Sequence, residues 1–537
     1  MENLDLMLLR HRVDRLVQRW NRPDSPGMTV GVVQDGALVL HSQVGMASLE
    51  LGVPVGPATA FRIASVSKQF TCAAILLLAA EGRLNVQDPV RSHVPELPDY
   101  GQRLTVAHLM HNASGIRDML EIMRQGGGDL SQPCRRDDLV DAICRQRSLN
   151  FTPGSRYLYS NSNFLLLGLI VERITGEGLP AFLERRIFAP IGMNLTRMTE
   201  STTEVAPGLA TGYMPRHGGG WVRAAHAFPL GGEGGLVSCV EDLALWDQNL
   251  ATGRIGGLAL TEALEKQAPF TNGHPSHYAR GLSVGAQRGV RTVEHGGQWP
   301  GFRTNFLRAP ALGLTVICIS NDGSADPYHL GHDILDAAIE GRPGVHPMPP
   351  SPAAAELSRF VGRYLNRDTG ATVDFVDGDA GVTGSTHGSA FRLAATPDGR
   401  LAASHSAPDF AASLSADGST LTVEADAGAI TTYRRVTTGT TLPADLPGTY
   451  ANPDIAATWT VFETDGKLSV RVSGPLLVKS GPWQVEPIEG DCIRIFPPAG
   501  LYQMWLDVRI LRDPAGAVAG LAVTGGRARR LTFGRMG

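Results

Sequence analysis

The sequence predicts an α/β (α+β) domain in which helices flank an antiparallel sheet, followed by two all-β barrels of about eight antiparallel strands each. Three observations lead to this fold class. An apolar helix lies among strand-like segments early in the chain, a proline-rich stretch marks a boundary, and a β-rich unit then occurs twice. We expect a first domain at 1–341, a linker at 342–354 and barrel domains at 355–440 and 441–537.

The composition is that of a globular protein. Of 537 residues, 43% are hydrophobic and 19% charged, and the net charge is −4. No basic field favours nucleic acid, and no apolar run approaches the ~20 residues of a membrane span. The N-terminus lacks a secretory signal, and the six cysteines are scattered without a C-x-x-C pair. We therefore expect a cytoplasmic protein with reduced thiols that binds neither nucleic acid nor membrane.

The first elements follow from hydrophobic periodicity. An N-terminal amphipathic helix is expected to place five apolar residues on one side: Leu6, Leu9, Val13, Leu16 and Trp20. Residues 28–44 predict a β-hairpin because two apolar segments flank the turn at Asp35-Gly36. A short helix at 104–116 and an apolar helix from Phe164 follow.

The second half of the first domain predicts a glycine-rich loop, a short strand and a helix start at 231–246. Strands at 293–306 and 314–321 and a last helix near 328–340 complete it. The order along this domain is therefore strands, then helices, then strands and a final helix, as in an α/β arrangement with an antiparallel sheet.

Ser65 and Lys68 lie three residues apart at the start of the apolar helix, so one helical turn separates them on one face. The N-terminus of a buried helix favours developing negative charge, and a lysine whose pKa is lowered by burial can take a serine's proton. The structural alternative is a serine cap and a surface lysine, because S-x-x-K by itself is common.

Two further polar fragments interrupt apolar segments. Tyr159-Ser160-Asn161 precedes the helix from Phe164 and can equally be a polar loop that caps it. His295-Gly296-Gly297 lies within a strand pattern, where glycine lets another backbone or a ligand approach closely.

After the linker, two segments match in register, 360–375 and 446–461. The matched pairs are Gly362/Gly448, Tyr364/Tyr450, Asn366/Asn452 and Asp368/Asp454. The ends of the two units are also alike, at 431–436 and 528–533. A duplicated unit with about eight short strands favours a small antiparallel barrel.

S-x-x-K at Ser65, Y-x-N at Tyr159 and H-G-G at His295 occur in the order found in the penicillin-recognising serine hydrolases, which the chain resembles over roughly 15–340. These are the class C β-lactamases, DD-peptidases and related esterases. The stretch S-V-S-K-Q-F-T-C-A, the histidine of the third motif and the two barrels resemble the bacterial D-aminopeptidases more narrowly. This resemblance implies a β-lactamase/transpeptidase-like domain, lipocalin-like barrels, a last-barrel loop that shapes the active site, and a homodimer.

The resemblance also implies roles. Ser65 forms an acyl-enzyme, and Tyr159, with its pKa lowered by Lys68, accepts the proton, although Lys68 itself stays open as the base. Asn161 orients the substrate amide and bonds Lys68. His295 replaces the usual lysine and polarises the site or shuttles a proton. The N–H groups of Ser65 and Gln298 form the oxyanion hole, and Gly296 and Gly297 admit the substrate backbone. Neither a cofactor nor a metal is implied.

An aminopeptidase must pair the substrate's ammonium group with a carboxylate. We expect the intruding loop at 496–505, which contains no acid. The candidate carboxylates are Asp491, Asp507, Glu233, Glu294 and Asp322. Three histidine pairs have metal-like spacing, but no cysteine or carboxylate cluster completes them: His108/His111, His274/His277 and His329/His332.

The sequence thus predicts a serine hydrolase, in particular a D-aminopeptidase that releases N-terminal D-residues from short peptides or amides. A broader esterase or DD-peptidase-like hydrolase is the first alternative. A penicillin-binding sensor that is acylated without turnover is the second.

Overall fold

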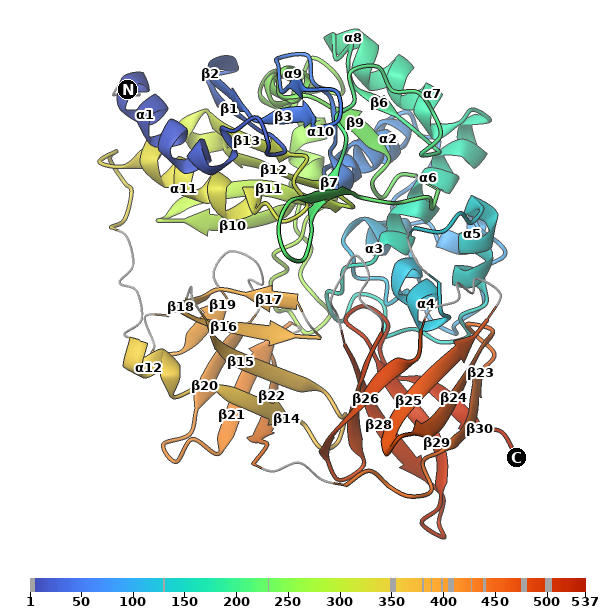
Figure 1. Ribbon diagram of the computed structural model, residues 1–537. Helices are drawn as coiled ribbons and strands as arrows, with labels where there is room; N and C mark the ends of the chain where they lie inside the picture. Colours follow the sequence, from blue (N-terminus) through green and yellow to red (C-terminus); the bar gives the residue numbers. More distant parts are fainter. Residues whose placement is uncertain are drawn as a thin grey trace.

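The computed structural model describes residues 5–128, 131–229, 231–347, 354–378, 381–387, 389–396, 399–403, 410–425, 427–437, 441–474, 481–497 and 505–537. Figure 1 shows a body of sheet and helices above two β-barrels that lie side by side, with the C-terminus at the end of the second barrel. The predicted fold class is confirmed. Residues 348–353 of the predicted linker lie outside the described residues, and the domain boundaries stay a prediction.

A six-stranded antiparallel sheet organises the first body, in the order β10-β11-β12-β13-β1-β2. Its strands are β1 (Met28–Gln34), β2 (Ala37–Val44), β10 (Ser283–Gln287), β11 (Val290–Trp299), β12 (Phe302–Ala309) and β13 (Leu314–Ser320). The hairpin turn forms as predicted, because Asp35 and Gly36 both adopt positive φ, 51° and 79°. β1 and β13 pair across the centre, which brings the two ends of this body together.

Helices α1 (Leu6–Val17) and α11 (Pro327–Ile339) cover one face of the sheet. Leu9, Val13 and Trp20 are buried there as predicted, but Leu6 and Leu16 are 42% and 37% exposed. Val17 is the buried residue of the last turn, because the apolar stripe follows the true 3.6-residue period.

The other face carries α2 (Lys68–Ala80), α6 (Asn161–Thr175) and α9 (Val240–Thr252), which share one apolar core. α6 begins at Asn161, three residues before the apolar run, and ends at Gly176 with φ of 75°. The smaller helices are α3 (Val106–Met110), α4 (Met119–Gln125), α5 (Arg136–Cys144), α7 (Leu179–Leu183), α8 (Ala189–Ile191), α10 (Gly257–Leu264), and the single turns η1 (Gln18–Trp20), η2 (Ala64–Ser67), η3 (Val90–Ser92), η4 (Glu184–Phe188) and η5 (Pro310–Leu312).

Short strands connect the helices of this body. They are β3 (Met46–Ser48), β4 (Val53–Pro54), β5 (Phe61–Arg62), β6 (Arg197–Met198), β7 (Tyr213–Pro215), β8 (Trp221–Arg223) and β9 (Leu236–Ser238). β5 pairs with β9, so the chain reaches the predicted nucleophile directly from a small sheet.

The second barrel is closed and eight-stranded, as predicted. Its strands are β23 (Gly448–Asn452), β24 (Ala457–Thr464), β25 (Lys467–Ser473), β26 (Trp483–Glu489), β27 (Cys492–Phe496), β28 (Leu506–Arg512), β29 (Val518–Thr524) and β30 (Leu531–Arg535). Trp459, Trp483 and Phe533 pack together in its interior, with ring centroids 4.4–5.4 Å apart. Side chains therefore fill this barrel.

The first barrel has nine strand segments instead of eight. After α12 (Ala354–Ser358) come β14 (Gly362–Leu365), β15 (Thr372–Gly378), β16 (Gly381–Thr386), β17 (Ser389–Phe391), β18 (Leu393–Ala395), β19 (Leu401–Ala403), β20 (Ala411–Leu414), β21 (Thr420–Ala425) and β22 (Ala429–Arg435). β17 and β18 are separated by Arg392 alone, and they pair with β16 and β19 respectively. One interrupted strand thus joins the two edges, and the sheet is nearly closed.

The sequence repeat has a structural counterpart. Tyr364 donates to the carbonyl of Phe360, and Tyr450 donates to that of Leu446. The two matched asparagines likewise donate to the last strand of their own barrel, at Thr432 and Thr532. The matched residues therefore hold the same corner of each barrel, as their predicted core role requires.

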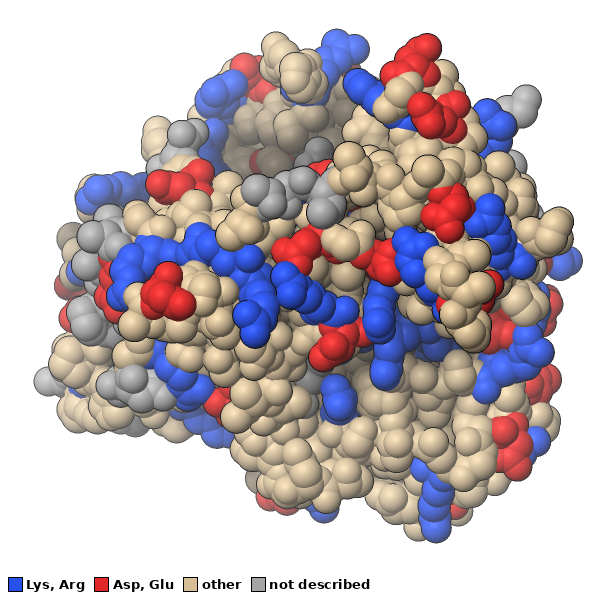
Figure 2. All heavy atoms as spheres, turned by 90° about the horizontal axis from the view of Figure 1, so that it is seen from below, with Lys and Arg blue, Asp and Glu red and all other residues tan. Residues whose placement is uncertain are grey.

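The barrels contact each other and the first body through buried polar groups. Arg494 of the second barrel bonds Asp374 of the first at 2.8 Å. Trp459 donates to the carbonyl of Gln125 on α4 at 2.9 Å. Figure 2 views the barrel side and shows Lys and Arg mixed with Asp and Glu over the described part of this face. No helix within the described ranges is long and apolar enough to cross a membrane.

Candidate active site

Ser65 lies in the single turn η2 that leads into α2. The preceding residue, Ala64, has φ of 49°, a left-handed conformation that costs a non-glycine residue roughly 1–3 kcal/mol. This backbone is held by Leu236, whose carbonyl accepts from Ile63 N–H. The strained turn places the serine hydroxyl at the wall of a pocket of about 350 Å³.

Lys68 is fully buried one turn later. Its Nζ lies 3.0 Å from Ser65 Oγ, 2.9 Å from Asn161 Oδ1 and 2.6 Å from the carbonyl oxygen of Glu233. Burial lowers the pKa of this amine to about 7. The structural alternative of a surface lysine is therefore wrong, and the amine is poised between its charged and neutral forms at neutral pH.

Tyr159 Oη donates to Ser65 Oγ at 2.6 Å, so both candidate bases, Lys68 and Tyr159, contact the same hydroxyl. We expected Lys68 to lower the pKa of Tyr159. Instead, burial raises the pKa of this phenol well above its ordinary value. The electrostatics thus favour neutral Lys68 over a Tyr159 phenolate as the initial base.

Asn161 connects Lys68 to the buried carboxylate of Asp118. Its backbone N–H and its Nδ2 both donate to Asp118 Oδ2, at 2.6 and 2.9 Å. Asp118 also caps α4. Asn161 Oδ1 is therefore directed toward Lys68. The fragment at 159–161 thus contacts the lysine directly and is more than a polar loop that caps the helix.

His295 faces the same pocket from β11, with its ring centroid 6.0 Å from that of Tyr159. Nδ1 donates to the carbonyl of Gly296, so Nε2 accepts from Tyr278 Oη at 2.9 Å. Burial, followed by the Lys68 charge, lowers the pKa of this imidazole to about 3. His295 is therefore neutral and adds no second positive charge beside Lys68.

Gly296, Gly297 and Gln298 line the pocket on the part of β11 beyond its partner β10, whose pairing ends at Glu294. That edge is open to a ligand. A Cβ on Gly297 would lie 2.2 Å from the carbonyl oxygen of Ile63, whereas one on Gly296 meets nothing closer than 3.7 Å. Gly297 thus lets β11 approach the turn before Ser65. We had expected this glycine to make room for the substrate backbone instead.

Arg527 is the residue that the sequence did not single out. It lies in the β29–β30 turn of the second barrel, lines the catalytic pocket, and stands 4.6 Å from the ring centroid of Tyr159. Its carbonyl accepts from Asp118 N–H and Asn150 Nδ2. Most of the loop predicted to enter the site, 498–504 of 496–505, lies outside the described residues.

A difference between the two sequence repeats could have pointed to the β29–β30 turn. The corresponding turn of the first barrel runs from Ala425 to Ala429, whereas G-G-R-A-R-R at 525–530 is longer and basic. A loop extended in one repeat only is a candidate for a function beyond barrel closure.

The five candidate carboxylates are distributed over the molecule. Only Glu233 lines the catalytic pocket, while Glu294 lines a second cavity. Asp491 pairs with Arg512 at the surface, Asp507 bonds Thr372 between the barrels, and Asp322 accepts from Trp20. Asp326, at the start of α11, is a further pocket-lining acid that we had not considered.

The histidine pairs do not form metal sites in the part of the chain that the structure describes. Within it, no three His, Cys, Asp or Glu side chains gather as a metal site. His108 instead caps its own helix at Thr105, and His332 bonds Gln287 and Glu294.

The fold, with a serine hydroxyl in contact with a buried lysine amine at the start of a buried helix, is that of a serine hydrolase. Residues 12–340 match the Beta-lactamase family, more than half of the chain, and the chain belongs to this family.

Several known proteins are similar to this chain over most of its length. The D-aminopeptidase of Cereibacter sphaeroides is 27% identical over 545 residues, covering 99% of this chain and 100% of the relative. The D-aminopeptidase of Brucella canis is 30% identical over 387 residues, covering 71% of each. An octameric penicillin-binding protein homologue from Pyrococcus abyssi shares the fold, with a TM-score of 0.56 and 20% identity over 99% of this chain and 100% of that chain.

Proposed function

We propose that the protein is a D-stereospecific aminopeptidase that releases the N-terminal D-residue of short peptides and amides through an acyl-enzyme on Ser65. The observation that carries the chemistry is the buried Lys68 amine, 3.0 Å from Ser65 Oγ and with its pKa near 7. The specificity rests on relatives named D-aminopeptidase that align over the full chain.

In the proposed mechanism, Ser65 Oγ attacks the substrate carbonyl carbon while its proton passes to Lys68 Nζ, directly or through Tyr159 Oη. The N–H groups of Ser65 and Gln298 donate hydrogen bonds to the developing oxyanion; losing one such donor costs about 10²–10³ in rate. The C–N bond then breaks, and the leaving amine takes the proton back from Lys68. Water then attacks the acyl carbon as its proton passes to Lys68 Nζ, directly or through Tyr159 Oη. The ester bond to Ser65 Oγ breaks, Oγ takes the proton from Lys68, and the D-residue leaves as the free acid.

Asn161 and His295 have supporting roles in this proposal. Asn161 fixes the Lys68 amine, because its side chain is itself held by Asp118. The neutral His295 polarises the site through Tyr278 and spares Lys68 a neighbouring positive charge that would weaken the amine as a base and make proton uptake from Ser65 harder.

We propose Asp326 as the carboxylate that reads the substrate's ammonium group. Its side chain is 44% exposed at the pocket rim, where a substrate can reach it. Glu233 is the other pocket acid, but it is buried beside Lys68 and its Oε1 accepts from Gly231 N–H. Glu233 therefore acts on the lysine, and Asp326 on the substrate.

The test compares initial rates on D-alanine, L-alanine and N-acetyl-D-alanine p-nitroanilides, with Ser65→Ala as the control. Turnover of the free D-compound alone, lost in the variant, supports the proposal. Equal turnover of the blocked compound supports the broader esterase or DD-peptidase-like hydrolase instead. Stoichiometric labelling of Ser65 by a penicillin without turnover of any substrate supports the sensor.

Asp326→Asn and Glu233→Gln separate the two acids. We expect Asp326→Asn to reduce kcat/KM for free-amine substrates at least 10-fold while leaving any slow hydrolysis of the blocked compound unchanged. We expect Glu233→Gln to change both substrates alike, because it acts through Lys68.

Three finer features are also proposals: a cytoplasmic location, a homodimer and lipocalin-like barrels. Six free cysteines support a reducing compartment. The eight-strand antiparallel order of the second barrel supports the barrel kinship. Light scattering of the purified protein tests the dimer, and fractionation of the source cells tests the location.

A further inference from the structure

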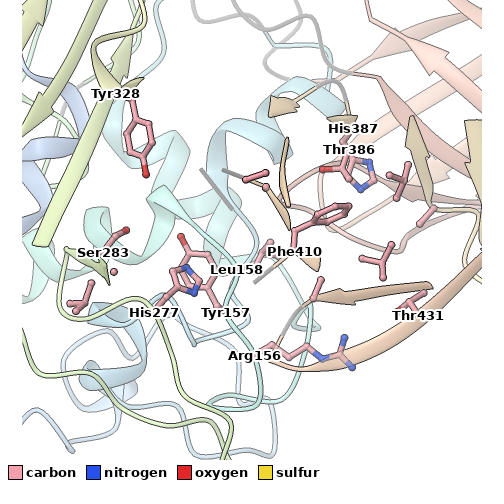
Figure 3. Close-up of a pocket in the computed structure, with 18 of the residues that line it drawn as sticks. Arg156, Tyr157, Leu158, His277, Ser283, Tyr328, Thr386, His387, Phe410 and Thr431 are labelled. Atoms are coloured by element: carbon pink, nitrogen blue, oxygen red, sulfur yellow. The ribbon is translucent and has the colours of Figure 1, made fainter. Parts of the chain in front are cut away.

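The segment that carries Tyr159 into the site, residues 156–160, has no regular secondary structure. It borders a second cavity, of about 940 Å³, which lies between the first body and the first barrel. Figure 3 shows Tyr157 and Leu158 at the wall of this cavity. Neither a helix nor a sheet holds this backbone, so its position depends on contacts from elsewhere in the chain.

Those contacts come from the connection between α3 and α4, residues 111–118. Leu158 N–H donates to the backbone carbonyl of Asn112, and Ser160 N–H donates to its side-chain oxygen, both at 3.0 Å. Asn112 is fully buried and has φ of 52°, a left-handed conformation in which asparagine is enriched. One residue of the connection thus holds the backbone on both sides of Tyr159.

Asp118 ends the same connection and holds the next residue, Asn161. Its Oδ2 accepts from the N–H of Asn161 at 2.6 Å and from Asn161 Nδ2 at 2.9 Å. Its Oδ1 accepts from the first turn of α4, at the N–H groups of Leu120 and Glu121. Four donors meet two oxygens, so both oxygens must accept, as only a carboxylate can. An asparagine here would turn its NH₂ group toward one of the two pairs of donors.

The Asp118 carboxylate is close to the catalytic amine. Asp118 is 1% exposed, and the Asn161 amide alone separates it from Lys68 Nζ. Burial is the largest effect on the pKa of Lys68 and lowers it, whereas the negative charge of Asp118 raises it. Asp118 therefore acts on Lys68 in two ways, through the orientation of Asn161 and through its charge.

We propose that Asp118 is a positioning residue of the acyl-enzyme reaction, which holds the Asn161 amide against Lys68 Nζ and fixes the backbone that follows Tyr159. Asp118 is not among the described residues that line the catalytic pocket, so it acts through Asn161 and not on the substrate. The inference rests on the proposed role of Lys68 as the base, but not on the proposed D-stereospecificity.

The first experiment follows the titration of Lys68 in the full-length protein by NMR. The chain has only four lysines, Lys68, Lys266, Lys467 and Lys479, so a protein labelled with [6-¹³C]lysine gives few signals, and Lys68→Met assigns the relevant one. Asp118→Asn removes the charge and is expected to lower the pKa of Lys68 by about half a unit to one unit. An unchanged titration in folded Asp118→Asn would overturn the inference.

The second experiment measures Ser65 acylation and turnover with p-nitrophenyl acetate, an ester without a D-residue, against pH. Asp118→Asn is expected to lower kcat at least about 10-fold and to move the ascending limb to lower pH, with KM changed by less than about 3-fold. In the Asn161→Ala background, Asp118→Asn is expected to lower kcat by no more than about 2-fold, because the connecting amide is already gone. Effects that multiply in the double variant would overturn the action through Asn161.

The variants are chosen to separate positioning from helix capping. Asparagine and serine cap helices about as well as aspartate, so Asp118→Asn and Asp118→Ser both keep a cap for α4. Asp5→Asn is the matched control, because Asp5 caps α1 far from the site, and it is expected to keep the wild-type pH profile. Unfolding temperatures are measured for all variants, and Asp118→Ser replaces Asp118→Asn if the latter does not fold.

The outcomes also distinguish this inference from the proposed function. Wild-type kcat and pH profile in folded Asp118→Asn and Asp118→Ser would overturn the positioning role and leave the D-aminopeptidase proposal standing. Equal turnover of free and N-acetylated D-alanine p-nitroanilides by the wild type would contradict the D-aminopeptidase, while the predicted shifts in Asp118→Asn would still support the positioning role.

Discussion

Arg527 offers a direct test of whether the second barrel takes part in catalysis. Lys68 Nζ and the Arg527 guanidinium lie 4.8 and 4.6 Å from the ring centroid of the same residue, Tyr159. The Arg527 charge lowers the pKa of Lys68, after the larger effect of burial. Replacing Arg527 by methionine therefore removes a positive charge that favours the neutral, proton-accepting lysine.

The magnitude follows from the geometry. The two charges are no more than about 9 Å apart, and at an effective dielectric of about 20 their repulsion is about 2 kcal/mol, or just over one pKa unit. Arg527 is partly exposed, so solvent screening reduces this to roughly half a unit to one unit. The pKa of Lys68 is then expected to rise from about 7 to nearly 8.

The assay is the pH profile of kcat/KM for the preferred p-nitroanilide. We expect the ascending limb of Arg527→Met to move up by roughly half a unit to one unit, with activity about 2- to 5-fold lower at pH 7 and restored above pH 9. Arg527→Lys retains the charge and is expected to keep the wild-type profile. An unshifted limb in Arg527→Met, or a loss of activity that high pH does not restore, would refute the electrostatic reasoning.

Three further outcomes are expected. In the wild type, kcat/KM rises with pH to a plateau with a midpoint near 7, because Lys68 is neutral only above its lowered pKa; a flat profile from pH 5 to 9 would exclude Lys68 as the base. Gly297→Ala lowers the unfolding temperature and abolishes turnover because its Cβ would lie 2.2 Å from the Ile63 carbonyl oxygen, whereas Gly296→Ala is tolerated in melting experiments; equal effects would contradict the packing argument. Trp459→Ala costs about 3–5 kcal/mol in denaturant unfolding of the second barrel, and a change below 1 kcal/mol would show that the barrel is not filled as described.

Local patterns in the sequence predicted much of the fold. The Asp35-Gly36 turn forms where its dipeptide predicts, because a two-residue hairpin needs positive φ at both positions. The duplicated barrels were visible because the same tyrosine and asparagine contacts must hold each corner. Nine segments appear in the first barrel because one strand is interrupted at Arg392, and nothing in its local sequence marks that break.

The candidate site likewise has one part that local sequence predicted and another that it did not. Ser65 and Lys68 are neighbours on one turn, so their contact is a property of the helix and was predictable. The convergence of Asn161 and His295 on them followed only from resemblance, since they come from distant segments.

The sequence by itself determined the elements, the repeat and the contact between Ser65 and Lys68, because these depend on residues close in the chain or on short motifs. Only the tertiary structure decided which charges surround that pair. Burial in the folded protein raises the pKa of Tyr159, where the family resemblance had implied a lower value. The tertiary structure also brought Arg527 from the second barrel onto the Tyr159 ring. Burial and long-range electrostatics depend on the packing of segments hundreds of residues apart, and no local pattern encodes them.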